Sequence, residues 1–281
     1  MRILISSPID ITSSLTIQFI AKTGLCSGEP ATIHAVVEDG IDIKRTPGTR
    51  EEMLELPGIL NARIRIHSGD LDREMIREAS KGGYEMIVAG MRTIRKFRDG
   101  FMRKPSIIRL LNNSLSPVVV VKDRVTDVHR VLLCDSGAGI DPDLCSMTAH
   151  FLKRLKYVEE ISILHVMSQI SAGPGVVGQQ LRANSDELIK ENSLGGLILK
   201  RDIDLLAKSG IPVSAKIRHG LVVEEILREL NVGDYGLVVI GAHYSKGWQG
   251  LLLDDLATKI LQHVAEPILV VTRNPLSGDQ K

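Results

Sequence analysis

The sequence predicts an α/β protein made of two similar five-stranded parallel sheets, each with strand order 3-2-1-4-5 and helices on both faces. Three observations predict this fold class. Short apolar runs rich in β-branched residues alternate with helical patterns, which is typical of right-handed crossovers in a parallel sheet. The runs are almost continuously apolar, as expected for strands covered on both faces. The whole series also occurs twice, which indicates two copies of one fold.

Five segments of the first half recur in the second half in the same order. The pairs are RILISS (2–7) with RVLLCD (130–135), IHAV (33–36) with LHVM (164–167), GDLDREMIREA (69–79) with GLVVEEILREL (220–230), YEMIVAGMR (84–92) with YGLVVIGAH (235–243), and PVVVVK (117–122) with PILVVT (267–272). The order of the segments is constant, and the offset in residue number between matched segments changes in steps. The differences between the copies are therefore insertions in loops. The repeats predict two domains, residues 1–125 and residues 126–281.

The first repeat is expected to begin with a strand and a helix that runs from Ile11 to about Thr23. Its strands are predicted near residues 2–7, 31–37, 62–67, 85–90 and 117–122. The prolines and glycines of segment 39–60 break any long helix there.

The second repeat follows the same pattern with a longer insertion between its second and third strands. Its strands are predicted near residues 130–135, 160–167, 211–217, 235–241 and 267–272. A helical stretch over about 180–208 is expected to be interrupted at Gly195–Gly196. In the next helix, 220–230, helical spacing predicts one buried face made of Leu221, Val222, Glu225, Ile226 and Leu230.

The last strand of each repeat is a flat apolar edge, which would attract other chains if it were left bare. The segments are PVVVV at 117–121 and PILVV at 267–271. We expect them to pair with each other, antiparallel, across a pseudo-twofold axis. The two sheets would then be joined as a pseudo-dimer within one chain.

Composition excludes several classes of protein. The chain has 281 residues with a net charge of +1, and only 3% are aromatic, which does not suit a nucleic-acid stacking platform. The three cysteines, Cys26, Cys134 and Cys145, have neither C-x-x-C nor zinc spacing. No signal peptide and no apolar run of about 20 residues is visible. These features predict a cytoplasmic protein without a nucleic-acid or membrane partner.

The second strand of the second repeat carries the signature Leu164, His165 and Val166. With the fourth-strand end that leads into a loop, and the closing helix followed by a proline-initiated strand, it resembles the universal stress protein family in its tandem two-domain form. The resemblance covers nearly the whole chain. It implies a five-stranded parallel sheet, dimerisation through the fifth strand, frequent ATP binding, and a role in stress response or signalling rather than committed catalysis.

The family's phosphate loop reads G-x2-G-x9-G-S/T, in which glycines let backbone N–H groups approach phosphate and the last pair opens a helix. In the second repeat the matching residues are Gly241, Tyr244, Asp254 and Asp255, so only the first glycine is kept; Gly247 and Gly220 are further candidates. The Coulomb repulsion between one such aspartate and a phosphate 4 Å away is about 4 kcal/mol at an effective dielectric constant near 20. The alternative is that these aspartates cap the following helix.

The first repeat keeps Gly90 and continues into a basic loop. Arg92 and Lys96 belong to this loop, MRTIRKFRDGFMRKP, and could hold phosphate through their side chains. The alternative is a solvated basic loop, because most charge runs are surface.

The resemblance also implies a base-binding end of the site. The family places an acidic residue at the end of strand one, where the second repeat has Asp135 and the first repeat has Ser7. The family also uses backbone groups just after the strand-two histidine, which corresponds to Val166. The second repeat therefore keeps the base end and loses the phosphate end, which favours adenosine or AMP over ATP as a weakly bound ligand.

These residues predict a stress-response or signalling module with a degenerate adenine-nucleotide site, and the alternative is a nucleotide-free interaction scaffold. An enzyme is not expected, because no nucleophile motif or general base is evident. The glycines of segment 173–178 match G-x-G-x-x-G but follow the second strand, outside the dinucleotide context. The expected partners are an adenine nucleotide, a protein and a second copy of the chain.

Overall fold

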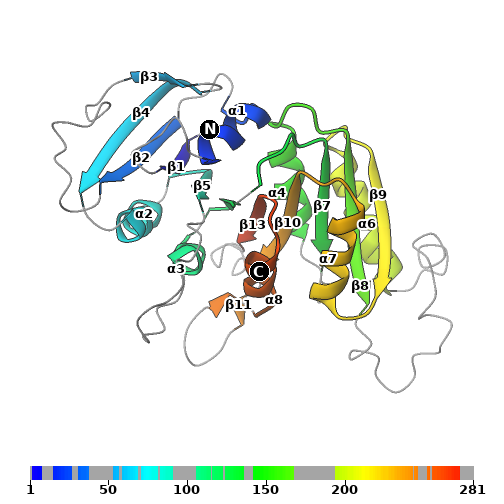
Figure 1. Ribbon diagram of the computed structural model, residues 1–281. Helices are drawn as coiled ribbons and strands as arrows, with labels where there is room; N and C mark the ends of the chain where they lie inside the picture. Colours follow the sequence, from blue (N-terminus) through cyan, green and yellow to red (C-terminus); the bar gives the residue numbers. More distant parts are fainter. Residues whose placement is uncertain are drawn as a thin grey trace, which may run out of the picture. The chain divides into compact units, whose positions relative to one another are not determined.

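The computed structural model has an α/β fold in which strands alternate with helices (Figure 1). It describes residues 2–7, 15–26, 31–37, 53–56, 59–68, 71–81, 83–90, 106–114, 116–122, 124–135, 142–167, 194–242, 244–245, 252–253 and 255–272. The chain divides into two compact units. The first is Met1–Asp127, Ala242–Asp254 and Ala265–Lys281, and the second is Val128–Gly241 and Asp255–Val264. The domain limits 1–125 and 126–281 stay a prediction.

The first unit has a mixed sheet with the order β3-β4-β2-β1-β5-β6-β13. Its elements are β1 (Ile3–Ser7), α1 (Leu15–Thr23), β2 (Ala31–Val37), β3 (Met53–Leu56), β4 (Ile59–Ser68), α2 (Leu71–Ser80), β5 (Met86–Gly90), α3 (Ser106–Asn113), β6 (Val118–Val121), β11 (Tyr244–Ser245), β12 (Leu252–Leu253) and β13 (Ile268–Thr272). Strands β4, β2, β1, β5 and β6 are parallel. They confirm the predicted order 3-2-1-4-5 for the first repeat.

The prediction of two five-stranded parallel sheets is wrong, because antiparallel strands make the sheet mixed. Strand β13 of the second repeat pairs antiparallel with β6, so that Leu269 lies opposite Val119 and Val270 opposite Val118. This confirms the expected pairing of the two last strands, and it makes the sheet continuous from one repeat into the other. The edge strand β3, which also runs antiparallel to its neighbour, was not predicted.

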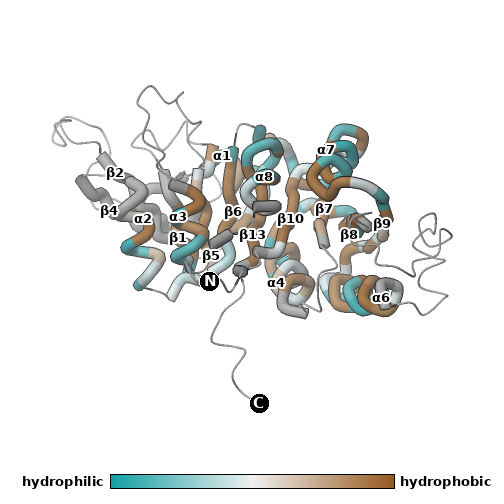
Figure 2. The backbone as a smooth tube through the Cα atoms, turned by 90° about the horizontal axis from the view of Figure 1, so that it is seen from below, coloured by the Kyte–Doolittle hydropathy of each residue, from teal (hydrophilic) through white to brown (hydrophobic). Residues whose placement is uncertain are grey.

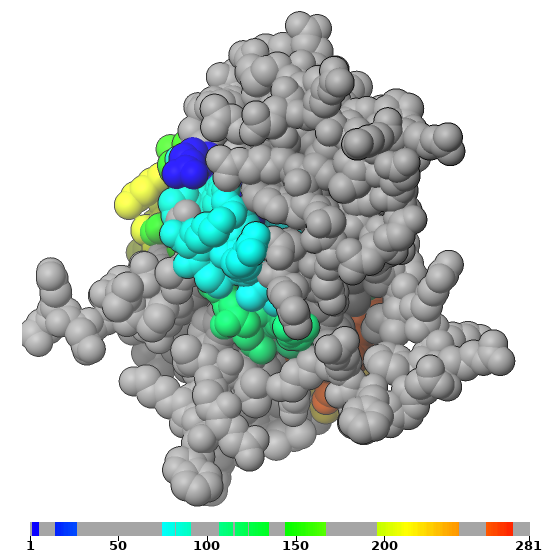
Figure 3. Space-filling model, turned by 90° about the vertical axis from the view of Figure 1, so that its left-hand side faces the viewer, coloured from blue at the N-terminus to red at the C-terminus, as the bar shows by residue number. Residues whose placement is uncertain are grey.

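The core of the first unit comes from the apolar runs of the sequence. Ile3, Leu4 and Ile5 of β1 and Phe19 of α1 have no exposed surface, because β1 is central in the sheet and α1 packs against it. Helices α2 and α3 lie side by side, and their described side chains form one continuous part of the surface in Figure 3.

The second unit has four parallel strands in the order β10-β7-β8-β9. Its elements are β7 (Arg130–Asp135), α4 (Pro142–Leu152), β8 (Glu160–Met167), α6 (Leu194–Ala207), β9 (Val213–His219), α7 (Val222–Val232), β10 (Leu237–Ala242) and α8 (Asp255–His263). Figure 2 shows α7 and α8 on one face of these strands and α4 and α6 on the other. The order matches the predicted 3-2-1-4, with β9 as strand three.

One helix prediction needs correction, and another stays a prediction. The glycine pair Gly195–Gly196 lies in the first turn of α6, which begins at Leu194. Residues 180–193 of the expected helical stretch lie outside the described residues, so its interruption stays a prediction. In α7 the buried residues are Glu225, Ile226 and Glu229, whereas Leu221, predicted on the buried face, is 52% exposed. Leu221 is the N-cap residue that precedes α7, so it lies outside the helix. No helix in the described part of the chain is long and apolar enough to span a bilayer.

Candidate functional site

The carboxyl edge of the second unit gathers four of the predicted binding residues. Asp135 is the last residue of β7, Val166 lies one residue before the end of β8, Gly220 directly follows β9, and Gly241 lies near the end of β10. Because these strands are parallel and adjacent, their ends meet at one edge, where open α/β sheets bind ligands. Their role in binding stays a prediction.

The other predicted residues are distributed differently. Gly90 ends β5 in the first unit, where it is exposed, and Asp255 is the first residue of α8. The start of α8 agrees with the expectation that a helix begins at this point. Four candidates lie outside the described residues, as does the side chain of Asp135: Arg92, Lys96, Gly247 and Asp254.

The chain after β10 forms a short hairpin that the sequence analysis missed. Tyr244 lies opposite Leu253, and Ser245 lies opposite Leu252, in an antiparallel pair. The two ends of the predicted phosphate loop are therefore joined by main-chain pairing. Strands of two residues carry no periodicity, so no sequence signal could have found them.

Gly220 has a backbone conformation and surroundings that select glycine. Its φ is +154°, and a Cβ atom at this position would lie 3.0 Å from Oε1 and 3.1 Å from Cγ of Glu225. Side chains rarely adopt such a conformation. The backbone of Gly220 is therefore packed against the Glu225 side chain, which is buried in the first turn of α7.

A buried carboxylate on α7 is the centre of a polar network between this helix and β9. Oε1 of Glu229 accepts hydrogen bonds from Lys216 Nζ at 2.6 Å and from the Tyr235 hydroxyl at 2.7 Å. Oε2 accepts one from Arg218 Nε at 3.0 Å. Glu229 is 1% exposed, so these partners replace the water that the charge has lost.

Electrostatics within this network favour the charged forms. Burial alone would raise the pKa of Glu229, but hydrogen bonds from Lys216, Tyr235 and Arg218 outweigh it and lower the pKa to about 2. Burial would lower the pKa of Lys216, yet the hydrogen bonds that it donates raise the pKa above 10.5. Burial raises the pKa of Tyr235 above 10.0. Glu229 and Lys216 are both charged at neutral pH, and Tyr235 keeps its proton.

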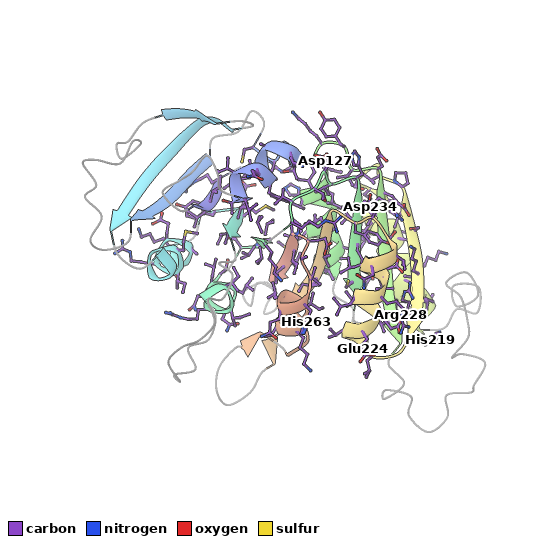
Figure 4. The ribbon with its side chains drawn as sticks, viewed as in Figure 1. Asp127, His219, Glu224, Arg228, Asp234 and His263 are labelled. Carbon is purple, nitrogen blue, oxygen red and sulfur yellow. The ribbon has the colours of Figure 1, made fainter. Side chains whose placement is uncertain are left out.

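The network continues to the carboxyl edge through Arg218. Its Nη1 lies 3.6 Å from Oε2 of Glu225, and Arg228 Nη1 donates to Oε1 of Glu225 at 2.5 Å. Figure 4 shows His219 and Glu224 near one end of α7 and Asp234 at the other end. Two arginines therefore balance the negative charge that Glu225 brings beside Gly220.

At the amino edge the network reaches Glu160 of β8. This carboxylate accepts a hydrogen bond from Ser214 at 2.7 Å and one from Arg130 Nε at 3.0 Å. The Ser214 hydrogen bond is the main cause that lowers the pKa of Glu160, and Arg130 adds to it. The guanidinium of Arg130 also lies over the ring of Tyr235, 4.9 Å from its centroid, within cation–π range.

The sequence analysis missed this network, although two signals were available. Lys216 and Arg218 are two residues apart on an edge strand, so their side chains lie on the same face of the sheet. Glu225 and Glu229 are four residues apart on a helix and therefore also share a face. Cations two residues apart on a strand, and carboxylates four residues apart on the helix that follows, therefore predict an interface of ion pairs between the two elements.

His219 is the last residue of β9, and its Nδ1 atom is buried with no partner within the described part of the chain. A buried nitrogen of this kind normally binds a protein group or an ordered water. The described residues contain no group of three metal-ligating side chains. The described residues of this edge thus include one buried imidazole nitrogen without a hydrogen-bond partner.

Comparisons with known proteins agree with this fold. A universal stress protein from Archaeoglobus fulgidus DSM 4304 is 18% identical, with 97% of this chain and 98% of that chain covered and a TM-score of 0.66. A functionally unknown protein from Pseudomonas aeruginosa PAO1 is 16% identical, with 97% and 92% covered and a TM-score of 0.66. These similarities show a shared fold over nearly the whole chain.

Comparison with the curated proteins finds no match. The model of the universal stress protein family matches residues 129–272, which is the second repeat and half of the chain. The match begins one residue before β7 and ends with β13. The chain therefore belongs to the universal stress protein family.

Proposed function

We propose that this protein is a tandem universal stress protein that acts as a stress-response or signalling module and weakly binds an adenine nucleotide at the carboxyl edge of its second unit. The observation that carries the proposal is the convergence of Asp135, Val166, Gly220 and Gly241 at that edge. The family resemblance assigns the base to the Asp135 end of this edge.

The charges near this edge favour a ligand with few phosphates. Glu225 lies against Gly220 and forms ion pairs with Arg218 and Arg228. Because both arginines are already paired, they attract a second anion only weakly. Asp254 and Asp255 replace the glycine and hydroxyl residue of the family's phosphate loop. We therefore propose adenosine or AMP as the preferred ligand over ATP.

Calorimetric titration with adenosine, AMP, ADP and ATP, with and without magnesium, tests the proposal. We expect binding of AMP, and we expect Asp135→Ala to weaken it about tenfold, the loss of one hydrogen bond to a charged group. Asp234→Ala is the matched control, because Asp234 is exposed and lies at the opposite end of α7 (Figure 4). Unchanged affinity in Asp135→Ala would show that the pocket is elsewhere.

The second candidate function is a nucleotide-free interaction scaffold. Large apolar side chains on the second unit favour it, since Val232 is 72%, Tyr157 67% and Leu221 52% exposed. Absence of heat and of a thermal shift with all four compounds would support the scaffold and refute nucleotide binding. In both cases we propose a binding protein rather than an enzyme, and release of phosphate from ATP well above background would contradict this.

A further inference from the structure

The same side-chain arrangement occurs in both repeats at the amino edge of the sheet. In the first unit the Tyr84 hydroxyl donates to Oε1 of Glu78 at 2.6 Å, and in the second the Tyr235 hydroxyl donates to Oε1 of Glu229 at 2.7 Å. Each glutamate lies on the crossover helix before the fourth strand, six residues ahead of its tyrosine. Both glutamates are buried, with 5% and 1% of their surface exposed.

An arginine at the start of each repeat completes the arrangement. Arg2 lies 5.0 Å above the ring of Tyr84, and Arg130 lies 4.9 Å above the ring of Tyr235. We call each set of three residues the Glu-Tyr-Arg clamp. Gly233 fits closely beside the second clamp, because a Cβ atom there would lie 2.2 Å from the ring of Tyr235. The clamp fixes the crossover helix to the first strand of its own repeat.

In the second unit the clamp connects to the carboxyl edge. Arg218 donates to Glu229, a member of the clamp, and its Nη1 atom also lies 3.6 Å from Glu225. Glu225 in turn lies against the backbone of Gly220. Arg218 is therefore the link between two carboxylates that are one helical turn apart.

The polar contacts between α7 and β9 are specific in direction. Ile226 is the apolar residue among the three buried residues of α7, and the others are the two glutamates. Apolar contacts tolerate sliding, but charged hydrogen bonds hold donors and acceptors within narrow distances and angles. A helix held in this way moves as a unit with the groups that it binds.

We infer that Arg218 is a positioning residue. The clamp at the amino edge fixes the position of α7, and Arg218 couples this position to the Gly220 turn at the carboxyl edge. Loosening the clamp then changes the backbone of Gly220, although Tyr235 and Gly220 lie at opposite edges of the sheet. The inference concerns the protein without ligand and does not depend on nucleotide binding.

Amide hydrogen exchange followed by mass spectrometry tests this inference on the full chain. Tyr235→Phe removes a single hydroxyl and keeps the ring, and Arg218→Lys keeps the charge but loses the planar fork that reaches two carboxylates. We expect both variants to increase exchange about tenfold or more in the segment Gly220–Glu225. Exchange in the central strand β7 should stay at the wild-type rate.

Tyr84→Phe is the matched control, because it breaks the equivalent hydrogen bond in the first unit. It should increase exchange at the end of α2 and leave Gly220–Glu225 unchanged. The inference is overturned if Tyr235→Phe leaves Gly220–Glu225 unchanged, or if exchange rises equally in β7 and at Gly220, since an equal rise indicates a general loss of stability.

Discussion

Glu229 makes the stability of the protein depend on pH in a predictable way. Its folded pKa is about 2, against an ordinary value of 4.5, because hydrogen bonds to the carboxylate outweigh the effect of burial. One pKa unit corresponds to about 1.4 kcal/mol, so this group contributes about 3 kcal/mol to the free energy of unfolding at neutral pH. Because the folded pKa is the lower one, the contribution is present above pH 4.5 and is lost as the pH falls toward 2.

Urea unfolding followed by circular dichroism at pH 7 and pH 3 measures this contribution. At pH 3 the wild type should have lost about 2 of the 3 kcal/mol due to Glu229. Glu229→Gln should be less stable at pH 7, because Lys216 and Arg218 lose their charged partner. It should also lose about 2 kcal/mol less than the wild type between the two pH values, since the titrating group is gone.

Glu224→Gln provides the matched control for this measurement. Glu224 lies in the first turn of the same helix, but its side chain is exposed, so the variant should lose as much stability as the wild type between pH 7 and pH 3. Equal losses in Glu229→Gln and the wild type would refute the reasoning. Such a result would mean that the carboxylate is not held by its neighbours in solution.

Two further predictions concern backbone positions. Gly233→Ala should lower the free energy of unfolding by about 1–3 kcal/mol in a urea titration, because the new Cβ atom would lie 2.2 Å from the buried ring of Tyr235; unchanged stability would show that the ring can move. Tyr157→Gly should raise the thermal midpoint by a few degrees, because Tyr157 is 67% exposed and has a φ of 69°, a conformation that costs about 1–2 kcal/mol for a residue with a Cβ atom. A lower midpoint would contradict that reading.

The strands could be predicted from sequence because parallel strands are apolar on both faces. The residues of β6, Val118 to Val121, are at most 1% exposed, and a run of four valines has few alternatives to a buried strand. The pairing of β6 with β13 was also predictable, because two bare apolar edges in one chain stabilise each other. Strand β3 was not, because MLEL has no β-branched residue and the strand exists through its contact with β4.

The candidate site was predictable in position but not in detail. Repeat matching located the ends of β7, β8, β9 and β10, and the topology brought them to one edge. The environment of Gly220 could not be foreseen, because it depends on the rotamer of Glu225 and on Arg218 from the neighbouring strand. Helical periodicity placed Glu225 on the buried face correctly but could not give its partner.

The two faces of the second unit's sheet differ in how they hold their helices, and this difference has a consequence for any ligand. On the face toward α4 and α6 the strands carry residues such as Ile161 and Ile163, which have no exposed surface. On the face toward α7 they carry the buried apolar Leu164 and, beside it, Lys216 and Arg218, whose charges are paired with carboxylates of the helix. Removing one of these partners leaves the buried charge of Glu229 without full compensation, which is strongly destabilising. A ligand that competes for Arg218 would therefore displace α7 rather than the helices of the opposite face.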